Sequence, residues 1–356
     1  MYKLLRKYLA MALACICMAG ALTGCTSGGL AKTYTVEEAS KTEVVKVGNE
    51  TVTLDEVFLY VIQCAYTYGL DKETAKESES TYKSTILEQI QDAKAKYQVA
   101  LTADIEITDE IKDEINEAVD RYYEAFGQEL FDGCGISRDA VYQLFLEQRY
   151  IAKLREKTLN DLYADYLKEA KDTYGDKTFI DVYYVMFPKT KIDAEGNSVD
   201  LSAEEIAAAK QNAERTRERA LAGESIEDIG KEYGEDSGVL ADTQRTFIGI
   251  YEKALNTMLS ELKNGEISEI YEDDAGYMVM QMVNNNDTEY RDYFLNTYAQ
   301  QKAEEAYTAM EKVWVGAMNI SDDDIIGDTW EKLTIVDIAD YIDKKGLKLD
   351  GQGTSK

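Results

Sequence analysis

The chain of 356 residues contains no histidine and one proline, Pro188. Without an imidazole, Ser-His and Cys-His catalysis and histidine-ligated zinc are excluded together. A single proline excludes a proline-rich spacer. No glycine pattern resembles a Walker loop or a dinucleotide-binding fingerprint. We therefore expect a protein that works without a cofactor and without a metal.

Basic residues are also scarce, with 39 Lys and Arg against 68 Asp and Glu and a formal net charge of −29. Residues 1–24 carry three of the basic residues and no acidic one, so the rest of the chain has 39 − 3 = 36 against 68, or −32. Such a charge repels phosphate backbones, and nucleic acid is not expected as a partner. The length suggests two or three domains, and 45% apolar residues can supply their cores.

The first residues predict export. Three basic residues precede an apolar stretch over residues 9–22, which ends in Leu22-Thr23-Gly24-Cys25. A basic start, a short apolar stretch and small residues at its exit are typical of a secretory signal, too short to span a bilayer. The last four residues resemble the lipobox of bacterial lipoproteins, which implies removal of residues 1–24 and a lipid on Cys25. The alternative is an ordinary signal with a chance cysteine.

Two cysteines of the mature chain remain, Cys64 and Cys134. They form either a disulfide or two buried free thiols, and we expect free thiols because a chain of this size needs no covalent staple. Beyond the signal, no stretch is long and apolar enough to span a membrane.

The first half of the chain has a helical pattern. After a polar tether at 25–43, residues 44–54 predict a hairpin around Gly48-Asn49. Thr53 and Glu56 form a capping box that opens a helix to about residue 67. Helices are also expected at 80–102, 109–126 and 137–175, from Leu, Ile and aromatic residues at helical spacing.

The pattern changes at Phe179, where β-branched and aromatic residues predict a strand over 179–187. A polar hairpin tip at 193–197, three helices and a strand over 277–283 follow, with a short strand near 246–250. The helices are expected from Ser202 to about 221, from Ser225 to near 234, and over 255–262. Residues 292–318 predict one more long helix, and 321–356 read as an acidic tail.

Two stretches resemble known families. Val44 to Lys157 is similar to the N-terminal chaperone region of SurA and of PrsA-type foldase lipoproteins, through V-G-x-x-x-V-T-L-x-E at 47–56 and G-I-S-R-D at 135–139. Residues 179–283 resemble a parvulin-type peptidyl-prolyl isomerase domain, through A-L-A-G-E-S at 220–225, L-K-N-G-E-I-S at 262–268 and A-G-Y at 275–277.

The resemblance implies an α+β fold in which a SurA-like helical module, completed by a C-terminal helix, carries an inserted β-α-α-α-β domain. The expected segments are a signal at 1–24, a tether at 25–43, a helical chaperone region at 44–176, a parvulin-like domain at 177–287, a return helix at 288–320 and an acidic tail at 321–356. It further implies a folding factor that binds unfolded exported polypeptides, anchored on the outer face of a membrane of the Gram-positive type. The residues leave open whether two copies pair.

The resemblance implies a pocket of the parvulin type. Such a pocket contains two facing histidines, an Asp or Cys beside them, and an apolar cup for the proline ring. The alignment places Tyr183 and Met278 at the histidine positions, Asp236 at the acid, Tyr251 and Leu255 in the cup, and Met280 on the same strand face as Met278. Whether isomerase activity survives these replacements is left open.

Alternatives remain for the protein and for its residues. The domain is either a folding factor with a lapsed pocket or an active isomerase in which Tyr183 and Asp236 replace the histidine network. A solute-binding lipoprotein is disfavoured by the helical stretch at 80–175. Asp236 also fits a solvated turn, and the methionines of the last strand also fit ordinary core packing.

Overall fold

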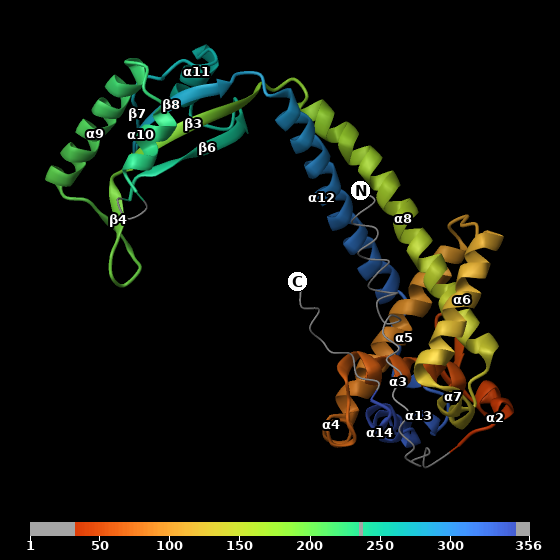
Figure 1. Ribbon diagram of the computed structural model, residues 1–356. Helices are drawn as coiled ribbons and strands as arrows, with labels where there is room; N and C mark the ends of the chain where they lie inside the picture. The colour runs from red at the N-terminus through yellow and green to blue at the C-terminus, as the bar shows by residue number, and fades with distance from the viewer. Residues whose placement is uncertain (1–32, 235–237, 347–356) are drawn as a thin grey trace. The chain divides into compact units, whose positions relative to one another are not determined.

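The computed structural model describes residues 33–234 and 238–346, in two compact units (Figure 1). The helical unit comprises Met1–Asn160 and Glu305–Lys356, and the sheet unit comprises Asp161–Glu304. The division falls within two long helices, α8 (Arg138–Tyr174) and α12 (Thr288–Gly316). The fold is α+β, as expected. Helix α8 matches the helix predicted at 137–175 to within one residue at each end. Helix α12 begins four residues before and ends two residues before the helix predicted at 292–318.

The helical unit begins with α2 (Val36–Lys41), the antiparallel hairpin of β1 (Glu43–Val47) and β2 (Glu50–Thr53), and α3 (Leu54–Tyr68). At the start of α3, the backbone N–H of Thr53 donates to Glu56 Oε2 at 3.3 Å, as a capping box requires. The unit continues with α4 (Lys72–Glu77), α5 (Glu79–Leu101), α6 (Asp109–Phe126) and α7 (Gln128–Cys134).

Gly135 ends α7 with φ of 67°, and a Cβ there would lie 2.5 Å from the carbonyl oxygen of Thr35. Only glycine allows both the left-handed backbone and this close approach. Cys64 and Cys134 are buried and free, as expected. Burial raises the pKa of Cys64 to about 11 and that of Cys134 to about 12.

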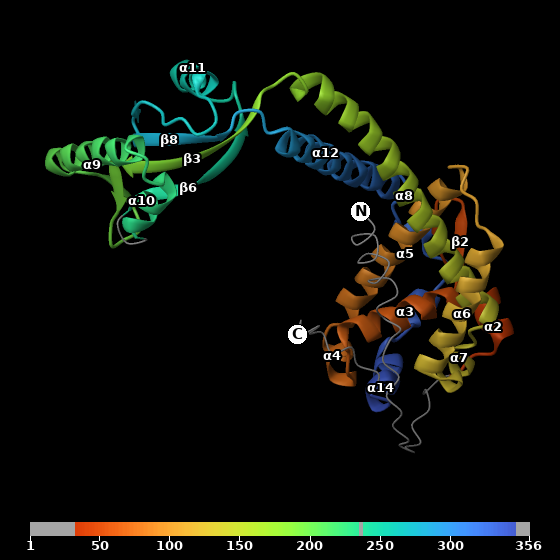
Figure 2. The same ribbon diagram turned by 45° about the horizontal axis from the view of Figure 1, so that its top comes forward.

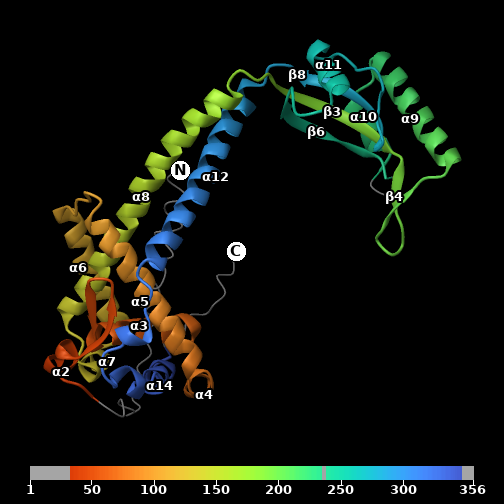
Figure 3. The same ribbon diagram turned by 180° about the vertical axis from the view of Figure 1, so that it is seen from behind.

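Residues 321–346 correct the expectation of an acidic tail; residues 347–356 lie outside the described chain. The segment forms a 3-10 turn η3 (Asp322–Asp324), α13 (Thr329–Lys332) and α14 (Val336–Lys344). Figure 3 shows α14 beside α3 and α4, and both contacts are extensive. Its apolar residues recur at helical spacing and join the main core, so burial outweighs the local acidity. The buried residues are Trp330, Leu333, Ile335, Ile338, Ala339, Tyr341 and Ile342.

The sheet unit is built on four antiparallel strands in the order β6 (Leu240–Phe247), β3 (Phe179–Pro188), β8 (Gly276–Asn284) and β7 (Tyr271–Glu272). The first and last predicted strands therefore lie side by side. The strand expected near 246–250 lies earlier in the chain, as β6, and pairs with β3 over eight residues. Strand β7 was not predicted.

Helices cover both faces of this sheet (Figure 2). On one face lie α9 (Ala203–Leu221) and α10 (Ile226–Glu232), and on the other lies α11 (Lys253–Glu261). We call these the α9/α10 face and the α11 face. A hairpin of β4 (Thr190–Ile192) and β5 (Ser198–Asp200) precedes α9, with the predicted polar tip between its strands. Ser202 accepts from the Glu205 N–H and its own N–H donates to Glu205, the predicted cap of α9.

Candidate functional site

The α11 face of the sheet carries the candidate site. Asp242 of β6, Tyr184 of β3 and Met280 of β8 are successive cross-strand partners in one row. The next row holds Leu240, Met186, Met278 and Tyr271, from β6 through β7. The segment that contains α11 packs over these rows with Tyr251, Leu255, Met258, Leu259 and Leu262. The result is a surface of tyrosine and methionine side chains.

Four of the predicted site residues gather on this face: Met278, Met280, Tyr251 and Leu255. Met280 and Leu255 are buried, whereas Met278 and Tyr251 are half-buried and so partly accessible. Asp236 lies outside the described residues.

Tyr183 does not join them. It pairs with Thr243 and Gln281 and belongs to the core of the α9/α10 face. There its hydroxyl lies against α10, since a Cβ on Gly230 would come within 2.9 Å of it. Successive residues of a strand point to opposite faces, so an alignment displaced by one residue moves a side chain to the other side of the sheet. The tyrosine of β3 that shares a face with Met278 is Tyr184.

Burial and a neighbouring carboxylate act on one phenol of the α11 face. Burial, followed by the charge of Asp242, raises the pKa of Tyr184. Tyr251 donates a long hydrogen bond of 3.4 Å to Thr246 Oγ1. The face therefore offers apolar surface and phenol hydroxyls, and none of its described residues is an activated nucleophile.

Metal chemistry finds no support among residues 33–234 and 238–346. No cluster of three or more cysteine, aspartate or glutamate side chains in this range is arranged to hold an ion. Over the same range, none of the helices has the length and apolar character needed to cross a bilayer.

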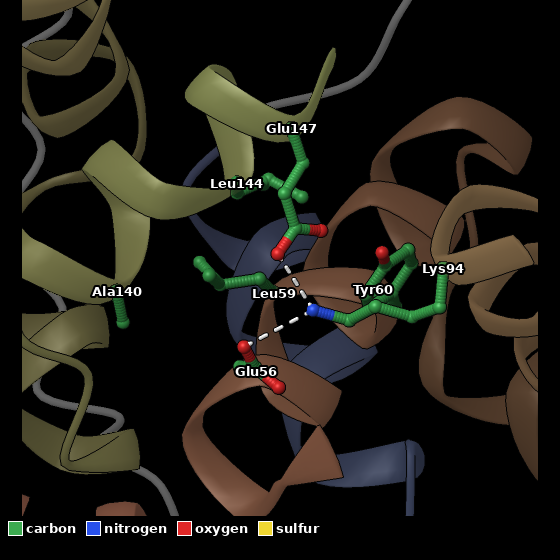
Figure 4. Close-up of a pocket in the computed structure, with 7 residues that line it drawn as sticks. All are labelled: Glu56, Leu59, Tyr60, Lys94, Ala140, Leu144 and Glu147. Atoms are coloured by element: carbon green, nitrogen blue, oxygen red, sulfur yellow. Dashed lines mark hydrogen bonds and ion pairs between the residues drawn. The ribbon is translucent and has the colours of Figure 1, made fainter. Parts of the chain in front are cut away.

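A small pocket lies in the helical unit, around an ion triad that the sequence analysis did not single out (Figure 4). The ammonium of Lys94 contacts Glu147 Oε1 at 2.7 Å and Glu56 Oε1 at 3.3 Å, and the Lys94 side chain is only 3% exposed. The cavity beside it has a volume of about 10 Å³, which is room for one water molecule. Tyr60 also lines it, with its hydroxyl buried and without a partner in the described chain.

The three charged side chains of the triad are paired with one another. Burial lowers the pKa of Lys94, but the two carboxylates outweigh it and the pKa is raised overall. Burial raises the pKa of Glu147, against the opposing charge of Lys94. The three ionic side chains come from α3, α5 and α8, so their contacts join these helices. A space for one water holds no substrate, and the role of the pocket is structural.

Comparison with known proteins supports the assignment of the sheet unit. Residues 192–284 match the model of the rotamase family, described as the PPIC-type PPIase domain. The chain therefore contains a parvulin-type domain. The match covers about a quarter of the chain and begins after β3, so Tyr183 and Tyr184 lie outside it. No curated protein sequence matches the chain.

Several solved structures are similar to the chain at low identity. The foldase PrsA of Lactococcus lactis is 13% identical, with 87% of this chain and 100% of that chain covered and a TM-score of 0.35. PrsA of Bacillus cereus is 17% identical, covers 77% and 92%, and has a TM-score of 0.29. A structure of the SurA-like chaperones PEB4 and Cj1289 of Campylobacter jejuni is 13% identical, covers 80% and 99%, and has a TM-score of 0.24. Values this low do not identify an activity.

Proposed function

We propose that this protein is a folding factor that binds unfolded exported polypeptides outside the cytoplasm and that its parvulin-type domain has little isomerase activity. The observation that carries the proposal is the composition of the α11 face. Its half-buried Tyr184, Met278 and Tyr251 are apolar and adaptable, and methionine suits surfaces that accept varied side chains. Binding would be weak and tolerant of sequence.

The low isomerase activity follows from the same face. An isomerase must favour the twisted amide over a barrier of about 18–20 kcal/mol, and oriented hydrogen-bonding groups in the pocket provide part of this preference. Met278 occupies one of the two positions where the family that the chain resembles has histidine, and the chain has no histidine at all. The Tyr184 phenol, whose pKa is raised by burial, does not rebuild a titrating network.

The lipid anchor belongs to the proposal as well. The lipobox-like Leu22-Thr23-Gly24-Cys25 would hold the protein where exported chains emerge. Replacement of Cys25 by serine should abolish incorporation of labelled palmitate and release the protein into the medium. Retention of a Cys25→Ser protein on membranes, with unchanged labelling, would contradict the anchor and leave the folding role untouched.

The central test separates holding from isomerisation. We expect the purified protein to suppress light scattering by a denatured, reduced client at near-stoichiometric ratios. We expect catalytic amounts to leave the slow, proline-limited refolding phase of a second client nearly unchanged. No suppression of scattering would refute the holding function.

An active isomerase is the second candidate, and the rotamase match over residues 192–284 favours it. A clear acceleration of the slow phase by catalytic amounts of protein would support this candidate and refute the proposed low activity. In that case loss of the acceleration in Asp236→Ala or Tyr184→Phe would identify the groups responsible.

A further inference from the structure

The two edges of the four-stranded sheet differ in how their backbone groups are satisfied. Along β8, the segment before β7 covers the outer edge. The N–H of Ser268 donates to Met280 O at 2.8 Å, that of Met282 donates to Glu266 O at 3.1 Å, and that of Gly265 donates to Met282 O at 2.7 Å. The β8 side of the sheet is therefore closed to a further strand.

The opposite edge is β6, and its geometry follows from the alternation of an antiparallel ladder. The N–H of Ile248 donates to Thr178 O at 2.9 Å, so even-numbered residues of this segment turn toward β3. The backbone groups of Ala241, Thr243 and Arg245 consequently turn outward. In the described part of the chain no strand pairs with this side of β6.

Within residues 33–234 and 238–346, the one side-chain hydrogen bond to these outward groups is local. The Thr243 N–H donates to the carboxylate of the adjacent, exposed Asp242 at 2.7 Å. This carboxylate can rotate into solvent, because it belongs to an exposed side chain, and the N–H then becomes available.

β6 also lacks three of the features that usually protect an edge. It pairs with β3 over eight residues without a bulge, and it contains no proline and no lysine. Its charged residues are Asp242 and Arg245, and Arg245 is held by two acids, with Nε 3.6 Å from Asp181 Oδ2 and 3.4 Å from Asp287 Oδ2. A long, regular edge without a bulge or a proline is a template for strand addition.

We propose that the outer edge of β6 binds an extended segment of a non-native polypeptide by strand addition. The proposal rests on the proposed folding function and names the form in which a client is held. Recognition would use the backbone groups of Ala241, Thr243 and Arg245, so it would tolerate almost any client sequence except one with proline at the paired positions.

Charge selects the occupant. The charged side chains near the start of this edge are mainly acidic. Asp242 of β6 and Glu227 and Asp228 of α10 all lie close enough to Tyr183 to influence its pKa, as does Lys231. Lys231 is already paired with Glu227 at 2.6 Å. A neutral or basic segment is favoured there, and a second copy of this chain is disfavoured because each copy has a net charge of −29.

The test uses two eight-residue peptides with the same alternating Val, Thr and Lys side chains, one of them N-methylated along its central residues. N-methylation removes the donors of both edges and keeps the side chains. We expect fluorescence anisotropy to show binding of the plain peptide to the purified protein and at least about tenfold weaker binding of the methylated one. Equal binding of the two peptides overturns the proposal without any variant.

A matched pair of variants localises the effect. Thr243→Pro removes an outward N–H and leaves the pairing with β3 intact, whereas Thr243→Val keeps the N–H. We expect roughly tenfold weaker peptide binding for the proline variant and unchanged binding for the valine variant, with circular dichroism verifying the fold.

The remaining outcomes are also decisive. If the protein suppresses client aggregation but binds the plain peptide no better than Thr243→Pro does, the edge proposal fails and the folding function stands. If it neither suppresses aggregation nor binds peptide, both fail. If sedimentation shows a dimer that Thr243→Pro dissociates, the occupant is a second copy and the proposal is overturned.

Discussion

The buried ion triad of the helical unit and the α11 face of the sheet unit differ in how tightly their side chains are held. In the helical unit, a buried ammonium is matched to two carboxylates, and the adjoining cavity holds about one water. On the α11 face of the sheet unit, Tyr184, Met278 and Tyr251 are only half-buried, and no ion pair orders them. The first arrangement tolerates little change, while the second accepts different neighbours. From this comparison we propose that the helical unit serves stability and that the α11 face serves binding.

The strongest test of this contrast removes the charge at the centre of the helical unit. Lys94→Met leaves Glu147 buried without a partner, and a broken buried ion pair costs about 3–5 kcal/mol. We expect a loss of this size in the free energy of unfolding, measured with urea. Lys41→Met, at an exposed pair with Glu37, should change little.

The double variant Lys94→Met with Glu147→Leu sharpens the result. Replacing both partners by apolar residues removes the unpaired charge, so we expect much of the lost stability to return. A double variant as unstable as Lys94→Met would show that packing, and not charge, dominates at this site.

The second prediction concerns α14, which contributes to the same core. Ile338 is 2% exposed, and shortening a buried isoleucine to alanine costs about 2–5 kcal/mol. We expect Ile338→Ala to lower the urea midpoint of the helical unit by a corresponding amount. Lys344→Ala, on the exposed side of α14, is the control. Equal midpoints for the two variants would mean that α14 adds no stability.

The third prediction moves to the α11 face. Met278→Asp places a charge on the proposed client surface, and we expect roughly tenfold weaker holding of a denatured client. Val283→Asp is a control on the same strand, because Val283 is 48% exposed and does not belong to the apolar cluster of the α11 face. Unfolding midpoints should differ less between these variants than their holding activities do. Equal loss of holding in both would contradict a role of the α11 face.

The sequence predicted the helices and the outer strands of the sheet because their signals are local. Capping residues, helical spacing and β-branched runs are read within a few residues. The role of residues 329–344 was not predicted, since an amphipathic face shows that a helix is buried somewhere but not what covers it. The acidic composition around that face also favoured a tail.

The candidate site was predicted in part for a related reason. The sequence placed Met278 and Met280 on one face of β8, and the structure confirms this, with Met282 in the same cluster. In β3, however, residues of both faces are apolar or aromatic, so alternation could not distinguish Tyr183 from Tyr184. The register of β3 with β6 and β8 determines that Tyr184, and not Tyr183, lies on the α11 face. Strand register depends on residues far apart in the sequence.

The fourth prediction uses pH to probe the closed core. The pKa of Cys134 is raised to about 12 by burial, from an ordinary value near 9. A raised folded-state pKa means that the protonated thiol stabilises the fold fully below pH 9 and that this stabilisation is lost as pH rises from 9 toward 12. Cys134 alone should lower the free energy of unfolding by about 1.4 kcal/mol per pH unit in this window, in addition to the effect of Cys64, whose pKa is raised to about 11. Cys134→Ala should make the slope shallower by this amount, whatever its effect on absolute stability, and an unchanged slope would assign the pH dependence to other groups.

The smallest expected effect separates the two tyrosines of β3. Tyr184→Phe and Tyr183→Phe each remove one hydroxyl, on the α11 face and the α9/α10 face respectively. If the α11 face binds clients through apolar contact, neither hydroxyl matters, and both variants should hold clients as the native protein does. If instead a phenol helps to twist a prolyl amide, any residual acceleration of proline-limited refolding should fall in Tyr184→Phe and persist in Tyr183→Phe. The opposite result, a fall in Tyr183→Phe alone, would require a pocket beneath α10, where Gly230 leaves no room for a substrate beside that hydroxyl.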